Sequence, residues 1–134
     1  MVMIGAHDWC KCQPLPLRIP VKKFIPRRDY DNKTDENDIA LLELAWDIPF
    51  PADNSIAPVC LPENPLDDNL TVNVIATGWG LMSKRKKVWP ENIFNSMFCA
   101  GGNMEGTCLE DSGGPLVMTT GTAEGPLVQI GVTS

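Results

Sequence analysis

The chain has 134 residues, of which 43% are hydrophobic and 21% charged, a composition typical of a globular domain. Its net charge of −6 argues against a nucleic-acid partner, because phosphate binding requires a basic face on the protein. No apolar run approaches the roughly 20 residues of a membrane-spanning helix. Residues 1–6 carry no basic segment of the kind that opens a secretion signal. We therefore expect neither nucleic acid nor membrane as a partner.

Proline and glycine are frequent throughout the chain, with 12 and 11 copies. Because these residues interrupt the chain every few positions, they leave little room for long helices and favour short strands joined by turns. The fold class is therefore predicted to be all-β.

The first half of the chain contains three segments of different pattern. Residues 14–25 mix apolar with basic side chains, which is typical of an irregular surface strand, and residues 27–37 form an almost wholly polar loop. Residues 38–44 are an apolar run of strand length and predict a buried strand. Prolines then recur from 47 to 68, which predicts an extended connector without helix or central strand.

The second half is predicted to contain four strands. Residues 71–80 alternate and end in Gly78-Trp79-Gly80, a pattern of a strand that closes in a tight turn. Further strands are expected around residues 97–100, 115–119 and 126–133. The basic residues 84–87 are interpreted as a solvated loop in preference to a localisation or anion-binding signal.

The most informative stretch is Asp111-Ser112-Gly113-Gly114-Pro115. A serine between an acid and two glycines suits a nucleophile, because glycines let backbone N–H groups approach a developing oxyanion. Ser112 is therefore the first candidate for a catalytic residue.

Five sequence blocks together resemble the trypsin- and chymotrypsin-like serine proteases, and they occur in that family's order. They are residues 37–42, 58–62, 76–80 and 97–101 and the Ser112 motif. The resemblance implies a trypsin-like double antiparallel β-barrel, here incomplete. It makes residues 1–134 a partial peptidase domain, with residues 1–50 ending the first barrel, 51–70 connecting, and 71–134 forming a shortened second barrel.

The resemblance also implies a catalytic role for individual residues. Ser112 corresponds to the nucleophile that forms the acyl-enzyme in peptide-bond hydrolysis, and Asp38 to the aspartate that orients a histidine base. Asp111 corresponds to the acid that pairs with a newly freed N-terminus on activation. The oxyanion hole corresponds to the backbone N–H groups of Glu110 and Ser112. This chemistry requires no cofactor and no metal.

Two further positions correspond to substrate-binding residues of the family. Gly106 corresponds to the floor of the specificity pocket, and Ser134 to a serine that touches the triad aspartate. Because Gly106 is not an acid, a literal count favours apolar or small substrate side chains; a deletion nearby would make that count misleading. The residue preference at the cleavage site stays open.

The chain departs from the family pattern in three respects. Its single histidine, His7, lies in a context that resembles a solvent-facing strand after the catalytic histidine, so the general base is absent from this sequence. Glu110 stands where the family has glycine, and its carboxylate opposes a developing negative charge; losing one oxyanion donor costs about 100- to 1,000-fold in turnover. The segment between Gly80 and Phe98 is shorter than in the family.

The five cysteines leave at least one thiol without a partner in the chain. By the resemblance, the counterparts of Cys60, Cys99 and Cys108 bridge to cysteines that this sequence does not contain. Cys10 and Cys12, with one residue between them, are poorly placed for a mutual bridge. With one histidine they also provide too few ligands for a structural zinc site.

Two triplets, Asn32-Lys33-Thr34 and Asn69-Leu70-Thr71, are N-glycosylation acceptor motifs. They fit a secreted protein, but such triplets also arise by chance, and both interpretations stay open. The resemblance implies an extracellular location, protein or peptide substrates, and protease inhibitors as further partners.

Three hypotheses for function follow. The first is a serine endopeptidase of the trypsin family whose chain, as given, is inactive by itself. The second is a non-catalytic protease homologue that acts as a binding or regulatory protein. The third is a transcript fragment with no folded product.

Overall fold

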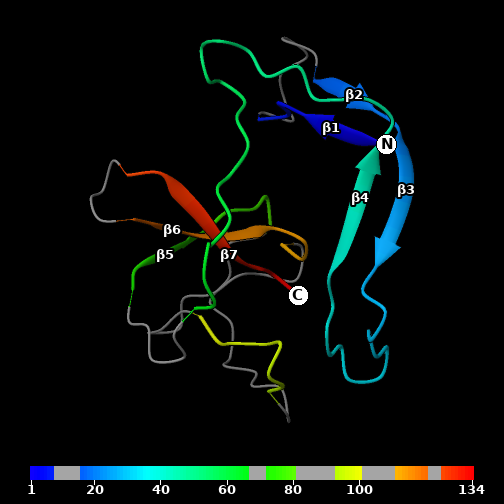
Figure 1. Cartoon of the computed structure of the whole chain (residues 1–134), viewed down its shortest axis with the longest axis vertical. Helices are drawn as coiled ribbons and strands as arrows, with labels where there is room; N and C mark the ends of the chain where they lie inside the picture. Colours follow the sequence, from blue (N-terminus) through cyan, green and yellow to red (C-terminus); the bar gives the residue numbers. More distant parts are fainter. Residues whose placement is uncertain (8–15, 67–71, 81–92, 101–110, 121–124) are drawn as a thin grey trace. The chain divides into compact units, whose positions relative to one another are not determined.

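The protein is described by a computed structural model over residues 1–7, 16–66, 72–80, 93–100, 111–120 and 125–134. Every regular element within these residues is a β-strand, which confirms the all-β prediction (Figure 1). The strands are β1 (Val2–Ile4), β2 (Leu17–Ile19), β3 (Val21–Pro26), β4 (Ala40–Leu44), β5 (Val74–Ala76), β6 (Pro115–Thr119) and β7 (Leu127–Val132).

The chain divides into two compact units, Met1–Pro58 and Val59–Ser134. The division falls within the proline-rich residues 51–70 that were predicted to be a connector. Residues 47–66 contain neither helix nor strand, as their prolines predict. The assignment of the two halves to a first and a second barrel stays a prediction.

The first unit contains two antiparallel pairs of strands. β1 pairs with β2, and Val2 lies opposite Ile19, which is fully buried. β3 pairs with β4 as a long-looped hairpin, in which Phe24 lies opposite Leu42 and Ile25 opposite Leu41. Residues 14–25 were expected to form one irregular strand; their described part forms β2 and most of β3, separated at Pro20.

The apolar run at residues 38–44 forms a strand, but the prediction that it is buried is wrong. Leu41 is 68% exposed and Leu42 49% exposed. The physical reason is that β4 hydrogen-bonds to β3 in a two-stranded sheet, and a strand is buried only where a second layer covers its face. Hydrophobic sequence pattern alone does not supply that layer.

The second unit is built on the antiparallel sheet β5-β6-β7, with β6 at its centre. Leu116 and Val117 of β6 and Val128 of β7 are buried and form the core of this unit. Cys60 extends the sheet beyond β7, because its N–H donates to Leu127 at 3.2 Å and its carbonyl accepts from Gln129 at 2.9 Å. The predicted strands near residues 71–80, 115–119 and 126–133 are confirmed as β5, β6 and β7.

The predicted strand at residues 97–100 is wrong. This segment follows a turn in which the N–H of Met97 donates to the carbonyl of Phe94 at 2.9 Å, and it pairs with no strand among the described residues. A side-chain contact replaces the backbone ladder, because the ring of Phe98 lies against Gly131 so closely that an added Cβ would approach it to 3.0 Å.

Candidate catalytic site

Ser112 lies exposed in a tight turn that leads directly into β6. The N–H of Gly114 donates to the carbonyl of Asp111 at 2.8 Å, which closes the turn. Gly113 has φ of +86°, a conformation that side chains beyond glycine rarely adopt. The turn is also attached to the end of β7, since Gly113 donates to Thr133 at 2.7 Å and Thr133 donates to Gly114 at 2.9 Å. The serine side chain is therefore presented on a backbone fixed on both sides.

Gly114 is required for a second reason, which is close packing of the backbone. An added Cβ would lie 2.8 Å from the carbonyl oxygen of Asp111 and 2.9 Å from that of Thr77. Neither oxygen belongs to a flexible side chain, so a larger residue would displace the turn from the end of β5.

The carboxylate of Asp111 packs against the turn after β5, at Gly78 and Gly80. Its Oδ1 accepts a hydrogen bond from the backbone N–H of Gly80 at 2.8 Å, in a partly buried position. A Cβ added at Gly80 would lie 2.6 Å from the same oxygen, and one added at Gly78 would fall directly on it. A larger residue at either position would therefore displace the carboxylate from its observed place.

Sequence reasoning missed the role of Gly78 and Gly80, which it interpreted only as a tight turn. The available signal was the pair of glycines on both sides of Trp79. Glycines in tight hairpin turns serve positions of positive φ, whereas neither of these two has positive φ. Their glycine character reflects the space needed by Asp111.

Asp38, the predicted triad aspartate, lies exposed at the end of the loop between β3 and β4. The preceding Asn37 has φ of +61°, and its carbonyl accepts from the N–H of Ile39 at 2.8 Å. Asp38 belongs to the first unit and Ser112 to the second. A catalytic arrangement that combines Asp38 with Ser112 therefore stays a prediction.

The environment of Asp38 is negatively charged. The hydroxyl of Tyr30 donates to Oδ1 of Asp35 at 3.3 Å. The pKa of Tyr30 is raised by partial loss of hydration and then by the charges of Asp35, Asp38 and Asp31. Asp38 is therefore one of the negative charges that raise the pKa of Tyr30.

The other predicted site residues have different outcomes. Ser134 directly follows Thr133 and thus lies at the end of β7 to which the Ser112 turn is attached. Glu110 and Gly106 lie outside the described residues. His7 is exposed, as predicted, but it follows β1 instead of forming part of it, and its N–H donates to Gly5 at 3.0 Å.

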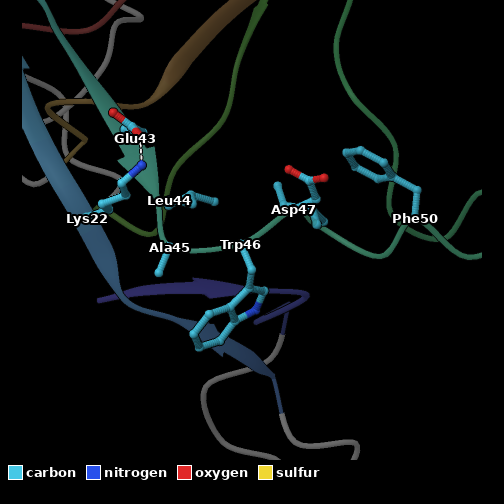
Figure 2. A pocket seen from close by; sticks show the side chains of 8 residues that line it. Lys22, Glu43, Leu44, Ala45, Trp46, Asp47 and Phe50 are labelled. Carbon is cyan, nitrogen blue, oxygen red and sulfur yellow. Dashed lines mark hydrogen bonds and ion pairs between the residues drawn. The ribbon is translucent and has the colours of Figure 1, made fainter.

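A hollow of about 700 Å³ lies in the first unit around the end of β4 (Figure 2). Figure 2 shows the ion pair of Lys22 and Glu43 at one side, and Trp46 and Phe50 among the lining side chains. Neither Asp38 nor Ser112 lines it. The hollow is therefore lined by residues other than the predicted catalytic ones.

Within the described residues, no cluster of three or more His, Cys, Asp or Glu side chains could hold a metal ion. Cys60 and Cys99 are exposed and carry no disulfide there, while Cys10, Cys12 and Cys108 lie outside the described part. The structure also describes no helix long and apolar enough to span a membrane.

Comparison with known proteins finds relatives that match most of this chain. Vitamin K-dependent protein C of Oryctolagus cuniculus is 31% identical over 147 residues, which cover 87% of this chain and 32% of that protein. Trypsin-1 of Astacus astacus is 35% identical over 138 residues, covering 86% of this chain and 56% of that protein. Vitamin K-dependent protein C of Felis catus is 32% identical over 128 residues, covering 75% of this chain and 80% of that sequence.

The chain spans about a third of the length of the first of these relatives. No solved structure matches it. The family model for trypsin, however, matches residues 1–134, the whole of the sequence. The chain therefore belongs to the trypsin- and chymotrypsin-like serine protease family.

Proposed function

We propose that this chain contributes the nucleophile and the orienting aspartate of a secreted serine endopeptidase, and that the 134-residue chain is inactive by itself. Ser112 is the proposed nucleophile, which would form the acyl-enzyme, and Asp38 the residue that would orient the base. Proteins or peptides are the proposed substrates. Protease inhibitors are the proposed binding partners.

The observation that carries this proposal is the geometry of the Ser112 turn. The serine is exposed, while the residues on both sides of it are fixed by hydrogen bonds to Gly80 and Thr133. The N–H of Ser112 makes no hydrogen bond to another described residue. It is thus available as an oxyanion donor, which requires an N–H that points at the reacting oxygen.

Inactivity of the isolated chain follows from the missing base. His7 is the single histidine, and its context resembles a strand that follows the catalytic histidine. A serine hydroxyl is a weak nucleophile without an adjacent base. Removing triad members leaves only residual catalysis from binding and oxyanion stabilisation.

A fluorophosphonate probe tests this proposal, because it reacts with activated serines. We expect the purified chain to label no more than its Ser112→Ala variant, with mass spectrometry of the peptide that contains Ser112 as the readout. Specific labelling of Ser112 would show that the chain activates its serine and would refute inactivity. Absence of labelling would agree with it.

A second experiment addresses the endopeptidase itself. Sequencing the complete transcript is expected to reveal an upstream Ala-Ala-His-Cys-like block that supplies the base. A mature message confined to residues 1–134 would contradict the endopeptidase proposal.

The alternative function, a non-catalytic binding homologue, is favoured by one specific observation. Glu110 stands where the family has a glycine in the oxyanion hole, and a carboxylate there disfavours the oxyanion. Glu110→Gly distinguishes the alternatives in the complete protein. A gain in peptide hydrolysis on substitution would indicate a catalytic site impaired by this residue, whereas unchanged absence of hydrolysis would favour binding.

A further inference from the structure

We propose that Asn32 is a site of N-linked glycosylation. Asn32-Lys33-Thr34 is an acceptor motif with a residue other than proline at its centre. The inference goes beyond the proposed peptidase function, because it depends on the exposed loop and not on Ser112. Its one premise is that the chain enters a compartment where oligosaccharide transfer takes place.

The structure places Asn32 at the tip of the loop that joins β3 to β4, drawn in cyan in Figure 1. The tip is the turn at residues 32–35, which the isolated bridge between Asp31 and Glu36 closes. Asn32 and Thr34, the two recognised side chains of the motif, are both exposed. A bulky glycan is compatible only with such a surface position.

The turn is shaped by the neighbours of Asn32 and not by Asn32 itself. Oδ1 of Asp31 accepts from the N–H of Lys33 at 2.8 Å, and Oγ1 of Thr34 accepts weakly from the N–H of Glu36 at 3.4 Å. The side-chain amide of Asn32 makes no hydrogen bond to any described residue. Attaching a sugar to that amide therefore breaks no interaction that holds the turn.

Asn37, in the same loop, provides the contrast. Its Nδ2 donates to the carbonyl of Asp29 at 3.1 Å, and its backbone has positive φ. Its side-chain nitrogen is therefore engaged in holding the loop, and the residues after it, Asp38 and Ile39, do not complete the motif. Asn37 is the matched control for Asn32.

The donor in the proposed reaction is an oligosaccharide linked to a lipid diphosphate. Nδ2 of Asn32 forms a bond to the anomeric carbon of the sugar, and the bond between that carbon and the diphosphate oxygen breaks. The lipid diphosphate leaves with the bonding electron pair, and the amide nitrogen loses one proton. No oxidation or reduction takes place.

The test is expression of the full chain behind a cleavable secretion signal in animal cells. Cell-retained and secreted chains are both collected, because oligosaccharide transfer precedes folding and is informative even where secretion fails. Enzymatic release of the glycan in ¹⁸O-labelled water converts each modified asparagine to labelled aspartate. Peptide mass spectrometry then reports Asn32 separately from the second motif at Asn69.

We expect the ¹⁸O label at Asn32. On a gel, Asn32→Gln should migrate faster than the unchanged chain, by the shift that one glycan causes. Thr34→Ala and Lys33→Pro should abolish the modification, Thr34→Ser should keep it, and Asn37→Gln should leave it unchanged. Absence of label at Asn32 in both fractions would overturn the proposal, as would retention of the label in Thr34→Ala. Neither result bears on the reactivity of Ser112.

Discussion

At the scale of single residues, Asp111 supports the Ser112 turn through both its side chain and its backbone. Its carboxylate accepts from the N–H of Gly80, and the same residue's carbonyl accepts from Gly114 across the Ser112 turn. The carbonyl of Asp111 thus closes the Ser112 turn, and its carboxylate attaches that turn to Gly80. The conformation of Ser112 depends on both.

Gly78→Ala is expected to destabilise the second unit, because the added methyl group would fall on Oδ1 of Asp111. Overpacking of this kind costs about 1–3 kcal/mol in the free energy of unfolding. Hydrogen exchange of the Gly80 N–H, which donates to the same carboxylate, should become faster. Urea unfolding followed by tryptophan fluorescence measures the stability change.

Ser112→Ala is the control for this prediction, because it changes an exposed side chain in the same turn. Its effect on stability should stay within about 0.5 kcal/mol. Equal stability of Gly78→Ala and the unchanged chain would show that the Asp111 carboxylate does not pack against Gly78.

At this scale the sequence pointed to Ser112, its acidic neighbour and its two glycines. It did not reveal that Gly78 and Gly80 make room for the side chain of Asp111. The motif around Ser112 is contiguous in the sequence, so the role of its glycines can be inferred from their position beside the serine. Gly78 and Gly80 act on Asp111 from a distant part of the sequence. A contact of this kind is determined by sheet pairing between β5 and β6, which single-residue patterns do not reveal.

At the scale of elements, the hairpin of β3 and β4 has a loop held by its own charged residues. Arg27 makes two hydrogen bonds to Asp29, at 2.7 and 3.2 Å, which lower the pKa of Asp29. Beyond them lie Tyr30 and the acids that raise its pKa. The loop therefore positions a single phenol within a field of carboxylates.

The titration of Tyr30 is expected to report this field directly, because it is the single tyrosine of the chain. Loss of hydration and the charges of Asp35, Asp38 and Asp31 raise its pKa above the ordinary value of about 10. Asp35→Asn should lower that pKa, since it removes a negative charge and leaves the phenol only a neutral amide oxygen as hydrogen-bond acceptor. Ultraviolet absorbance of the phenolate measures the shift.

The sign of the linked stability change follows from the raised pKa. A raised folded-state pKa means that the folded chain holds the phenol proton more tightly than the unfolded chain does. This stabilisation is present below the unfolded pKa and is lost as pH rises through the folded pKa. A Tyr30 pKa that stays the same in Asp35→Asn would contradict the described loop.

Sequence pattern predicted the position of most strands and failed on the burial of one, β4. The run at residues 38–44 contains β4 because its composition favours a strand, yet Leu41 and Leu42 are exposed. Burial depends on which other strands cover a face, and that information lies outside the segment. The segment at 97–100 failed for the same reason, since a strand exists only with a partner.

At the scale of the whole molecule, the described residues expose much of their apolar surface. In the β3 and β4 hairpin, Phe24 is 62% exposed and its cross-strand partner Leu42 is 49% exposed. Their neighbours Ile25 and Leu41 also form a cross-strand pair, with exposed fractions of 36% and 68%. Because successive residues of a strand point to opposite faces, the hairpin is apolar on both.

Such a hairpin agrees with the interpretation of this chain as an incomplete barrel, since a complete domain covers the apolar faces of its strands. Exposed apolar strands and unpaired edges are sites of self-association. We therefore expect the purified 134-residue chain to self-associate as its concentration rises. Analytical ultracentrifugation measures the mass distribution.

Replacing both Leu41 and Leu42 by lysine should reduce this self-association, because it places a charge on each face of β4. Leu61→Lys is the control, since Leu61 is 72% exposed but lies outside the strands; its effect should be smaller. A chain that stays monomeric at high concentration would show that the apolar faces of the hairpin are covered in solution. Equal effects of the two substitutions would indicate that general hydrophobicity, and not this hairpin, drives association.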